Sequence, residues 1–193
     1  MSNEILENNF QTKLTSFIKK NLKNIIISLI VIIISVLSFL FIKNLEKKNN
    51  IIISEKYTKA KILLSQKKIN LSKNLLEEII NEGNKFYSPL ALYLVVENNM
   101  EMDSDKIIIF FDQILKINSI DKENLNLINI KKAIYLFNTN NEELIVEILN
   151  PIINSSSVWK NVAINLITEY FLSKGQKVKA NEYIQLLNGA IKK

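Results

Sequence analysis

The side chains that could do chemistry in this chain are carboxylates, lysines and tyrosines, because its 193 residues include no histidine and no cysteine. Many carboxylates recur at spacings that would place them one turn apart on a helix, as a pair of catalytic acids requires. Acidic side chains at this spacing far more often form a solvated face or pair with nearby lysines. No glycine-rich phosphate loop, nucleophile elbow or metal motif accompanies them. We therefore expect a non-catalytic protein without cofactor or metal, with a carboxylate-dependent enzyme as the weaker alternative. The acidic groups are Glu77-Glu78 with Glu82, then Glu97, Glu101, Asp103 and Asp105, and finally Glu142-Glu143 with Glu147.

The missing residue types exclude whole classes of site. Without histidine or cysteine there is no Ser-His-Asp or Cys-His arrangement, no thiolate nucleophile and none of the ligands that zinc, copper and haem sites normally use. The chain also has no arginine, so all 25 basic residues are lysines. The net charge is +6, but lysine lacks the bidentate fork that base and phosphate recognition favours. We expect neither a nucleic acid nor a small-molecule substrate as partner.

A long uncharged stretch lies near the amino terminus. The nineteen residues between Lys23 and Lys43 carry no charge, and only three serines interrupt the apolar side chains of residues 25–42. Eighteen helical residues span roughly 27 Å, close to the ~30 Å hydrocarbon thickness of a bilayer. The serines are compatible with insertion, because a hydroxyl on a helix can hydrogen-bond to the carbonyl one turn earlier. Residues 25–42 are therefore predicted to span a lipid bilayer, since a buried core helix rarely stays apolar on every face for that long.

A cleaved signal peptide is the nearer alternative for this stretch, because lysines precede it. The run exceeds the ~7–15 residues of a signal h-region, and Phe39 to Lys43 offers no small-x-small cleavage site. We therefore expect an uncleaved anchor and three parts: a short tail (1–24), the anchor (25–42) and one helical domain (43–193). Lysines flank the run on both sides, so charge alone does not orient it, although long domains translocate largely regardless of charge.

Beyond the anchor, the apolar residues follow helical spacing. Only three glycines and two prolines occur in the chain, and a β-sandwich of this length would need many more of both in its turns. The run Ile107 to Phe111 could form a strand, but the acids before it and the apolar stripe up to Ile117 favour a helix. The sequence predicts an all-α domain of seven or eight helices. The first of them either continues the helix of the anchor or begins as a separate helix. The predicted helices are Ile51–Lys67, a second that begins near Asn70 or Ser72 as its cap and ends at Gly83, a third from Pro89 to Glu97 capped by Ser88, a fourth capped by Asp103 or Ser104, a fifth from Asp121 to Phe137, a sixth from Glu142 to Leu149 that Pro151 ends, a seventh from Val158 to Ser173, and an eighth after Gly175 that ends near Lys192.

Short helices joined by short polar turns are expected to pack as antiparallel pairs and to stack into an α-solenoid. The last pair has the small, large, aromatic, turn glycine, small, large, large order of a tetratricopeptide repeat. In that order, Gly175 permits the tight turn, Ala180 allows close approach, and Phe171 fills the space between the helices. Two places depart from the pattern: Lys73 stands where a small residue is expected, and the turn 98–102 has no glycine. The residues in repeat order are Ala163, Ile167, Phe171, Gly175, Ala180, Ile184 and Leu187.

Four further motifs extend the pattern over most of the chain: Glu55-Lys56-Tyr57-Thr58-Lys59-Ala60 after the anchor, Tyr87-Ser88-Pro89-Leu90-Ala91 opening a helix, Ile130-Lys131-Lys132-Ala133-Ile134-Tyr135, and Trp159-Lys160-Asn161-Val162-Ala163. With the anchor, they make the chain similar to the ancillary SecYEG translocon subunit family, whose members join a short tail and one membrane anchor to a tetratricopeptide-repeat-like domain. The resemblance implies a single-pass protein of the bacterial inner membrane with a short cytoplasmic tail (1–24) and a periplasmic carboxy-terminal domain. It also implies association with the protein-export translocon and contacts with chaperones or newly exported chains.

Tyrosines are the candidates for the partner-binding surface of such a solenoid, because a hydroxyl-tipped ring suits a partly wet groove. The candidates are Tyr57, Tyr93, Tyr135 and Tyr170, and the alternative for each is ordinary packing between helices. The function favoured by the sequence is a membrane-anchored, non-catalytic protein-protein interaction scaffold. An envelope assembly factor or divisome-type scaffold with another membrane partner is the alternative.

Overall fold

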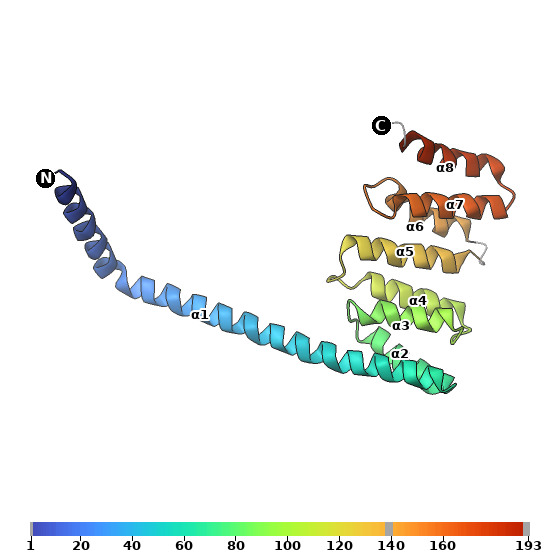
Figure 1. The fold of residues 1–193 in the computed structure, drawn as a ribbon, viewed down its shortest axis with the longest axis horizontal. Coiled ribbons are helices and arrows are strands. Elements are labelled where there is room, and N and C mark those ends of the chain that lie inside the picture. Colours follow the sequence, from blue (N-terminus) through green and yellow to red (C-terminus); the bar gives the residue numbers. More distant parts are fainter. Residues whose placement is uncertain (1, 138–140, 191–193) are drawn as a thin grey trace. The chain divides into compact units, whose positions relative to one another are not determined.

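A computed structural model of the chain describes the backbone of residues 2–137 and 141–190, and the side chains of residues 15, 19–24, 26–137 and 141–187. This part of the chain holds eight helices and no strand, so the all-α prediction is confirmed. The run Ile107 to Phe111 lies inside a helix, as predicted. The helices are α1 (Ser2–Ser65), α2 (Ile69–Asn81), α3 (Tyr87–Glu97), α4 (Ser104–Leu115), α5 (Lys122–Leu136), α6 (Glu142–Ile153), α7 (Lys160–Ser173) and α8 (Lys177–Ala190) (Figure 1).

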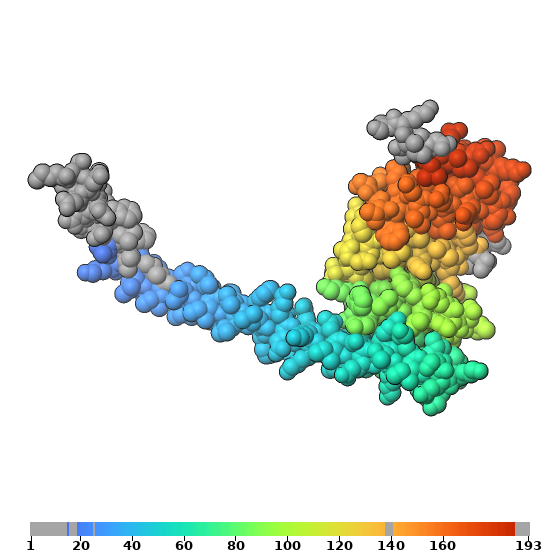
Figure 2. All heavy atoms as spheres, in the orientation of Figure 1, coloured from blue at the N-terminus to red at the C-terminus, as the bar shows by residue number. Residues whose placement is uncertain are grey.

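The chain divides into two compact units, Met1–Ile52 and Ile53–Lys193. In the first unit, every described side chain from Ile26 to Ile42 is exposed, and these side chains stand out from a single helix (Figure 2). Within the described residues, α1 is the one helix long and apolar enough to cross a membrane. The hydroxyl of Ser35 donates to the carbonyl of Val31 at 2.8 Å, which is the back-bond expected of a serine in an apolar environment.

Helix α1 is longer than predicted at its amino-terminal end. The sequence assigned no helix to the tail, whereas α1 begins at Ser2 and continues without interruption to Ser65. The predicted continuity between the apolar run and the first helix of the domain is therefore confirmed. Residues 53–65 of α1 belong to the second unit, where Ile53 and Ala60 are fully buried.

The second unit consists of the end of α1 followed by seven helices. From α2 onward each helix packs against the next one in the chain, and α2 also contacts α4, so that α2 to α8 lie stacked in chain order (Figure 1). Two apolar cores run through the stack, and α5 contributes to both: Ile128 belongs to the first core and Ile130 to the second. Because its opposite faces are both buried, α5 joins the two halves of the unit.

Two predicted serine caps are wrong, because both hydroxyls form contacts between helices. Ser72 lies within α2, is fully buried, and donates to the carbonyl of Ala60 in α1 at 2.8 Å. Ser88 lies within α3, is also fully buried, and donates to the carbonyl of Ile79 in α2 at 2.6 Å. The start of α3 is held instead by Asn84, whose side-chain oxygen accepts from two backbone N–H groups.

Of the two candidate caps of the fourth helix, Asp103 is confirmed, and a second aspartate, Asp121, caps α5 without having been predicted to do so. Asp103 accepts from the backbone N–H groups of Asp105 and Lys106 at the start of α4, and Asp121 accepts from that of Asn124 in α5. Pro151 does not end α6, which continues to Ile153. A proline in the last turn removes only one backbone hydrogen bond, so two further residues still fit after it.

The last helix pair has the local features that its sequence predicted. Gly175 adopts a left-handed φ of 73° between α7 and α8. Ala180 is fully buried, and the ring of Phe171 stacks on that of Tyr183 with centroids 5.7 Å apart. The predicted extension of the eighth helix beyond Ala190 lies outside the described residues.

Candidate partner-binding groove

Two adjacent depressions open on the second unit along helices α1, α3 and α5. The first lies between the end of α1 and the start of α3, and the second lies between α3 and α5. Phe86 and Leu90 line both depressions, so we treat the two as one groove, the α1–α3–α5 groove. Its lining consists of Ser54, Tyr57, Thr58, Lys61, Ile62, Ser65, Lys85, Phe86, Tyr87, Pro89, Leu90, Tyr93, Ile120, Asn124, Leu127 and Ile128.

Helical spacing brings these side chains to one face. On α3 and the residue before it, Phe86, Leu90 and Tyr93 are four and three positions apart, and such residues share a face of a helix. On α5, Asn124, Leu127 and Ile128 repeat the same spacing. Phe86 is 61% exposed although it is aromatic, so the centre of the groove presents a large apolar side chain to whatever binds there.

Two of the four predicted tyrosines line the groove. Tyr57 is half-buried, with its ring centroid 5.7 Å from that of Tyr87. Burial, together with the charge of Glu97 and the neighbouring Tyr87, raises the pKa of Tyr57. Burial raises the pKa of Tyr93 to about 12. Both phenols therefore stay protonated at physiological pH and can donate hydrogen bonds to a bound partner.

The other two tyrosines have packing contacts. Tyr135 is half-buried against the first core, with its ring 6.2 Å from that of Phe111. Tyr170 is 2% exposed, and its ring contacts those of Phe137 and Phe171 at 5.3 and 5.6 Å. Neither residue lines the groove. The prediction that Tyr170 faces an open surface is therefore corrected, because its ring is part of the second core.

Phe86 and Leu90, at the centre of the groove, are not among the predicted partner-binding residues. A signal was available, because residues 89–96 are apolar on most sides. A helix apolar all round must either be buried on every side or leave part of its apolar surface exposed. In α3, Ala91, Leu92 and Val95 take the buried side, and Leu90 and Tyr93 are left half-buried in the groove.

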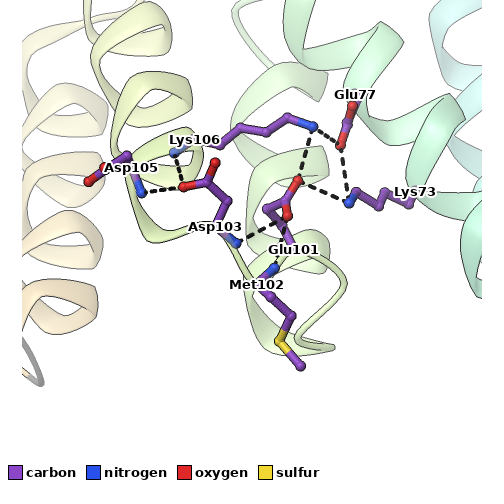
Figure 3. Close-up of polar contacts among 7 residues, drawn as sticks. All are labelled: Lys73, Glu77, Glu101, Met102, Asp103, Asp105 and Lys106. Atoms are coloured by element: carbon purple, nitrogen blue, oxygen red, sulfur yellow. Dashed lines mark hydrogen bonds and ion pairs between the residues drawn. The ribbon is translucent and has the colours of Figure 1, made fainter.

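The acidic clusters lie outside the groove and pair with lysines. Lys106 Nζ lies 2.8 Å from Glu77 Oε1 and 2.9 Å from Glu101 Oε2, and Lys73 Nζ lies 2.9 Å from Glu101 Oε2 (Figure 3). Glu101 also accepts from the backbone N–H groups that follow it. Hydrogen bonds from Lys73, Lys106 and the backbone of Asp103 lower the pKa of Glu101 to about 2. This cluster ties α2 to the α3–α4 connection and to α4.

The third acidic cluster has the same kind of contact. Glu142 accepts from Lys179 at 2.6 Å and from Gln176 at 2.8 Å, which links α6 to the start of α8 and lowers the pKa of Glu142. Among the described residues, no group of three or more acidic side chains could hold a metal ion. Glu77, Glu101 and Glu142 thus act as contacts between helices.

Comparison of the chain with protein-family models, with curated proteins and with solved structures gives no match. The function is therefore argued from geometry. The groove combines an apolar floor, two protonated phenols and lysines, and no carboxylate lines either depression. Such a surface suits a protein segment, which offers apolar side chains and polar groups at a regular spacing.

Proposed function

We propose that the protein is a membrane-anchored, non-catalytic scaffold whose second unit holds a segment of a partner protein in the α1–α3–α5 groove. The observation that carries the proposal is the exposed Phe86 at the junction of two depressions, flanked by Leu90 and Tyr93. Large exposed aromatic side chains beside a polar rim are typical of protein interaction sites.

The exposed apolar segment of α1 supports the proposal that the protein is anchored in a membrane. Seventeen consecutive exposed residues, 26–42, carry no charge, and a water-soluble protein rarely exposes so much contiguous apolar surface. Lys43 ends the uncharged segment, and its Nζ lies 5.3 Å from the ring of Phe39. A tether of this kind raises the local concentration of partners in the same membrane, so weak contacts suffice.

A tetratricopeptide-like α-solenoid is the architecture we propose for the second unit. Helices α1, α3 and α7 end alike, each with a residue of positive φ, namely Lys67, Asn99 and Gly175. In each case that residue and the next donate backbone hydrogen bonds back to the last helical turn, which is the Schellman arrangement. A fully buried small residue follows five positions later in the first and last pairs, Ser72 and Ala180. The small position predicted at Lys73 is therefore occupied by the residue before it, Ser72.

The resemblance to ancillary translocon subunits supports the export translocon, its chaperones or exported chains as partners, with the second unit in the periplasm. The test is photocrosslinking in intact membranes from Leu90, with Ile109 on α4 as the control because it is 61% exposed and does not line the groove. We expect protein adducts from Leu90 that are absent from Ile109 and that Phe86→Ala reduces. Equal adducts from both positions would contradict the scaffold function.

The identity of the adducts tests the finer part of the proposal. Recovery of export components supports the translocon, whereas recovery of non-export proteins alone would contradict it. Protease protection of the second unit in sealed membrane vesicles tests its side of the membrane. Digestion from the cytoplasmic face would contradict a periplasmic location.

A further inference from the structure

The charged side chains that line the groove are lysines. Lys61 lines the first depression and Lys85 the second, and Lys131 holds its Nζ 5.3 Å from the centre of the Tyr93 ring. Lys61 Nζ likewise lies 6.0 Å from the centre of the Tyr57 ring. No aspartate or glutamate lines either depression. The groove is therefore an apolar surface edged by ammonium groups.

Within the described residues, the groove lysines take no part in ion pairs, a property that they share with exposed lysines such as Lys68 and Lys116. Five other lysines form every ion pair found among the described residues: Lys56, Lys73, Lys106, Lys132 and Lys179. In that part of the chain Lys61, Lys85 and Lys131 have no carboxylate partner. The charge of Glu97 acts on Tyr57, but Glu97 does not line the groove.

On this basis we propose that the groove binds an acidic segment of a partner protein that also carries large apolar side chains. The proposal rests on the proposed function and specifies the chemistry of the partner. Three unpaired ammonium groups favour carboxylates by charge complementarity, which also excludes basic segments. The ammonium groups over Tyr57 and Tyr93 are held by the rings, so they lie at the edge of the groove before a partner arrives.

The depression between α3 and α5 limits the size of the apolar side chain that the partner can insert. Its volume is about 160 Å³, comparable to the roughly 150 Å³ cavity that holds one benzene ring in another protein. It can therefore take one large apolar side chain against Phe86, Leu90 and Leu127. Acidic residues of the segment on either side of that side chain would then face Lys85 and Lys131.

Three immobilised pools of short peptides test the proposal against the full-length chain in detergent micelles. All pools have leucine or phenylalanine at half of their positions, and the other half is drawn from Asp and Glu, from Lys, or from Gln. We expect the acidic pool to retain the most protein and to lose it as salt is added. The triple variant Lys61→Gln, Lys85→Gln, Lys131→Gln should lower retention by about two- to five-fold for each lysine. The matched control is Lys68→Gln, Lys116→Gln, Lys177→Gln, three exposed lysines outside the groove, and it should leave retention unchanged.

Loss of the charge preference, or a different occupant of the groove, would overturn the proposal. Equal retention by the Gln or Lys pool, or full retention of the triple variant, would remove the charge preference. If Phe86→Ala still lowered retention by all pools, the groove would bind protein segments without regard to charge, and the proposed function would stand. If Phe86→Ala changed retention by none of them, the proposed function would fail as well. If the full-length chain formed a dimer that Phe86→Ala converted to a monomer, the groove would bind a second copy of the chain. That result would also overturn the proposal.

Discussion

The hydroxyl of Ser72 in α2 reaches across to α1 and donates a 2.8 Å hydrogen bond to the backbone carbonyl of Ala60. Both residues are fully buried, and both are small, so the two helices approach closely at this point. The contact fixes the first helix pair of the second unit, and with it the position of α1 beside the groove.

Ser72→Ala and Ser72→Leu separate the two contributions of this contact. The alanine variant loses the hydrogen bond, so we expect the free energy of unfolding to fall by about 1 kcal/mol. The leucine variant also forces the helices apart, and overpacking should cost about 1–3 kcal/mol. Urea unfolding of the full-length chain in detergent, followed by far-UV circular dichroism, measures both. Ser119→Ala, at an exposed position, is the control. A leucine variant as stable as the alanine variant would contradict a close approach.

Glu101 gives the second unit a pH dependence with a defined sign. Its pKa is lowered to about 2 by Lys73, Lys106 and the backbone of Asp103, below its ordinary value in the unfolded chain. A carboxylate of this kind binds protons more readily when unfolded, so its contribution to stability is complete above about pH 4.3 and is lost as the pH falls toward 2. We expect Glu101→Gln to melt below the wild type at neutral pH, and the difference to disappear near pH 2.

Thermal melts by circular dichroism across this pH range measure the effect. Glu147→Gln is the matched control, because Glu147 is exposed and forms none of the ion pairs found in the described part of the chain. A difference between Glu101→Gln and the wild type that stays constant down to pH 2 would show that the ionised carboxylate is not its source.

Backbone strain at the helix ends predicts one stabilising substitution. Lys67 has a φ of 61°, a left-handed conformation that costs a non-glycine residue about 1–2 kcal/mol. Lys67→Gly removes that strain, but glycine loses more conformational entropy on folding than lysine does, which offsets part of the gain. We therefore expect up to about 1 kcal/mol of added stability. Lys68→Gly removes the same charge where φ is −86°, so it should not stabilise. Equal effects in urea unfolding would show that charge, and not strain, matters.

Gly175→Ala is the reverse change. Gly175 has a φ of 73°, and a Cβ placed there would meet nothing within 4 Å. The cost is therefore only that of the backbone, about 1 kcal/mol, measurable in the same urea titration. A larger loss would point to a close contact in this turn.

The sequence predicted the features of the fold that depend on local chemistry. Asp103 caps α4 as predicted, because an aspartate side chain reaches the backbone two or three residues ahead, whatever the rest of the protein does. A serine can form the same local bond or a bond to another helix, and nothing in the sequence around Ser72 or Ser88 distinguishes the two. Their true partners, Ala60 and Ile79, become neighbours only after the helices pack.

The groove was less predictable for a related reason. Its lining comes from three segments of the chain, around Tyr57, around Leu90 and around Leu127, and which faces meet depends on the crossing of α1, α3 and α5. The repeat pattern identified tyrosines by residue type, and two of the four line the groove. The lysines were not selected, because only the structure separates paired from unpaired ammonium groups.

The anchor can be tested by adding charge in measured steps. The fifteen apolar residues of segment 25–42 favour insertion by roughly 5–9 kcal/mol, and one lysine at the centre costs about 2.5–3.5 kcal/mol. We therefore expect Ile34→Lys alone to remain in the membrane after alkaline carbonate extraction. The triple variant Ile30→Lys, Ile34→Lys, Leu37→Lys exceeds what the apolar residues supply, so it should be released. Leu45→Lys, Ile51→Lys, Ile52→Lys adds the same charge at exposed positions beyond the segment and should stay bound. Release of this control, or retention of the central triple variant, would contradict residues 25–42 as the membrane span.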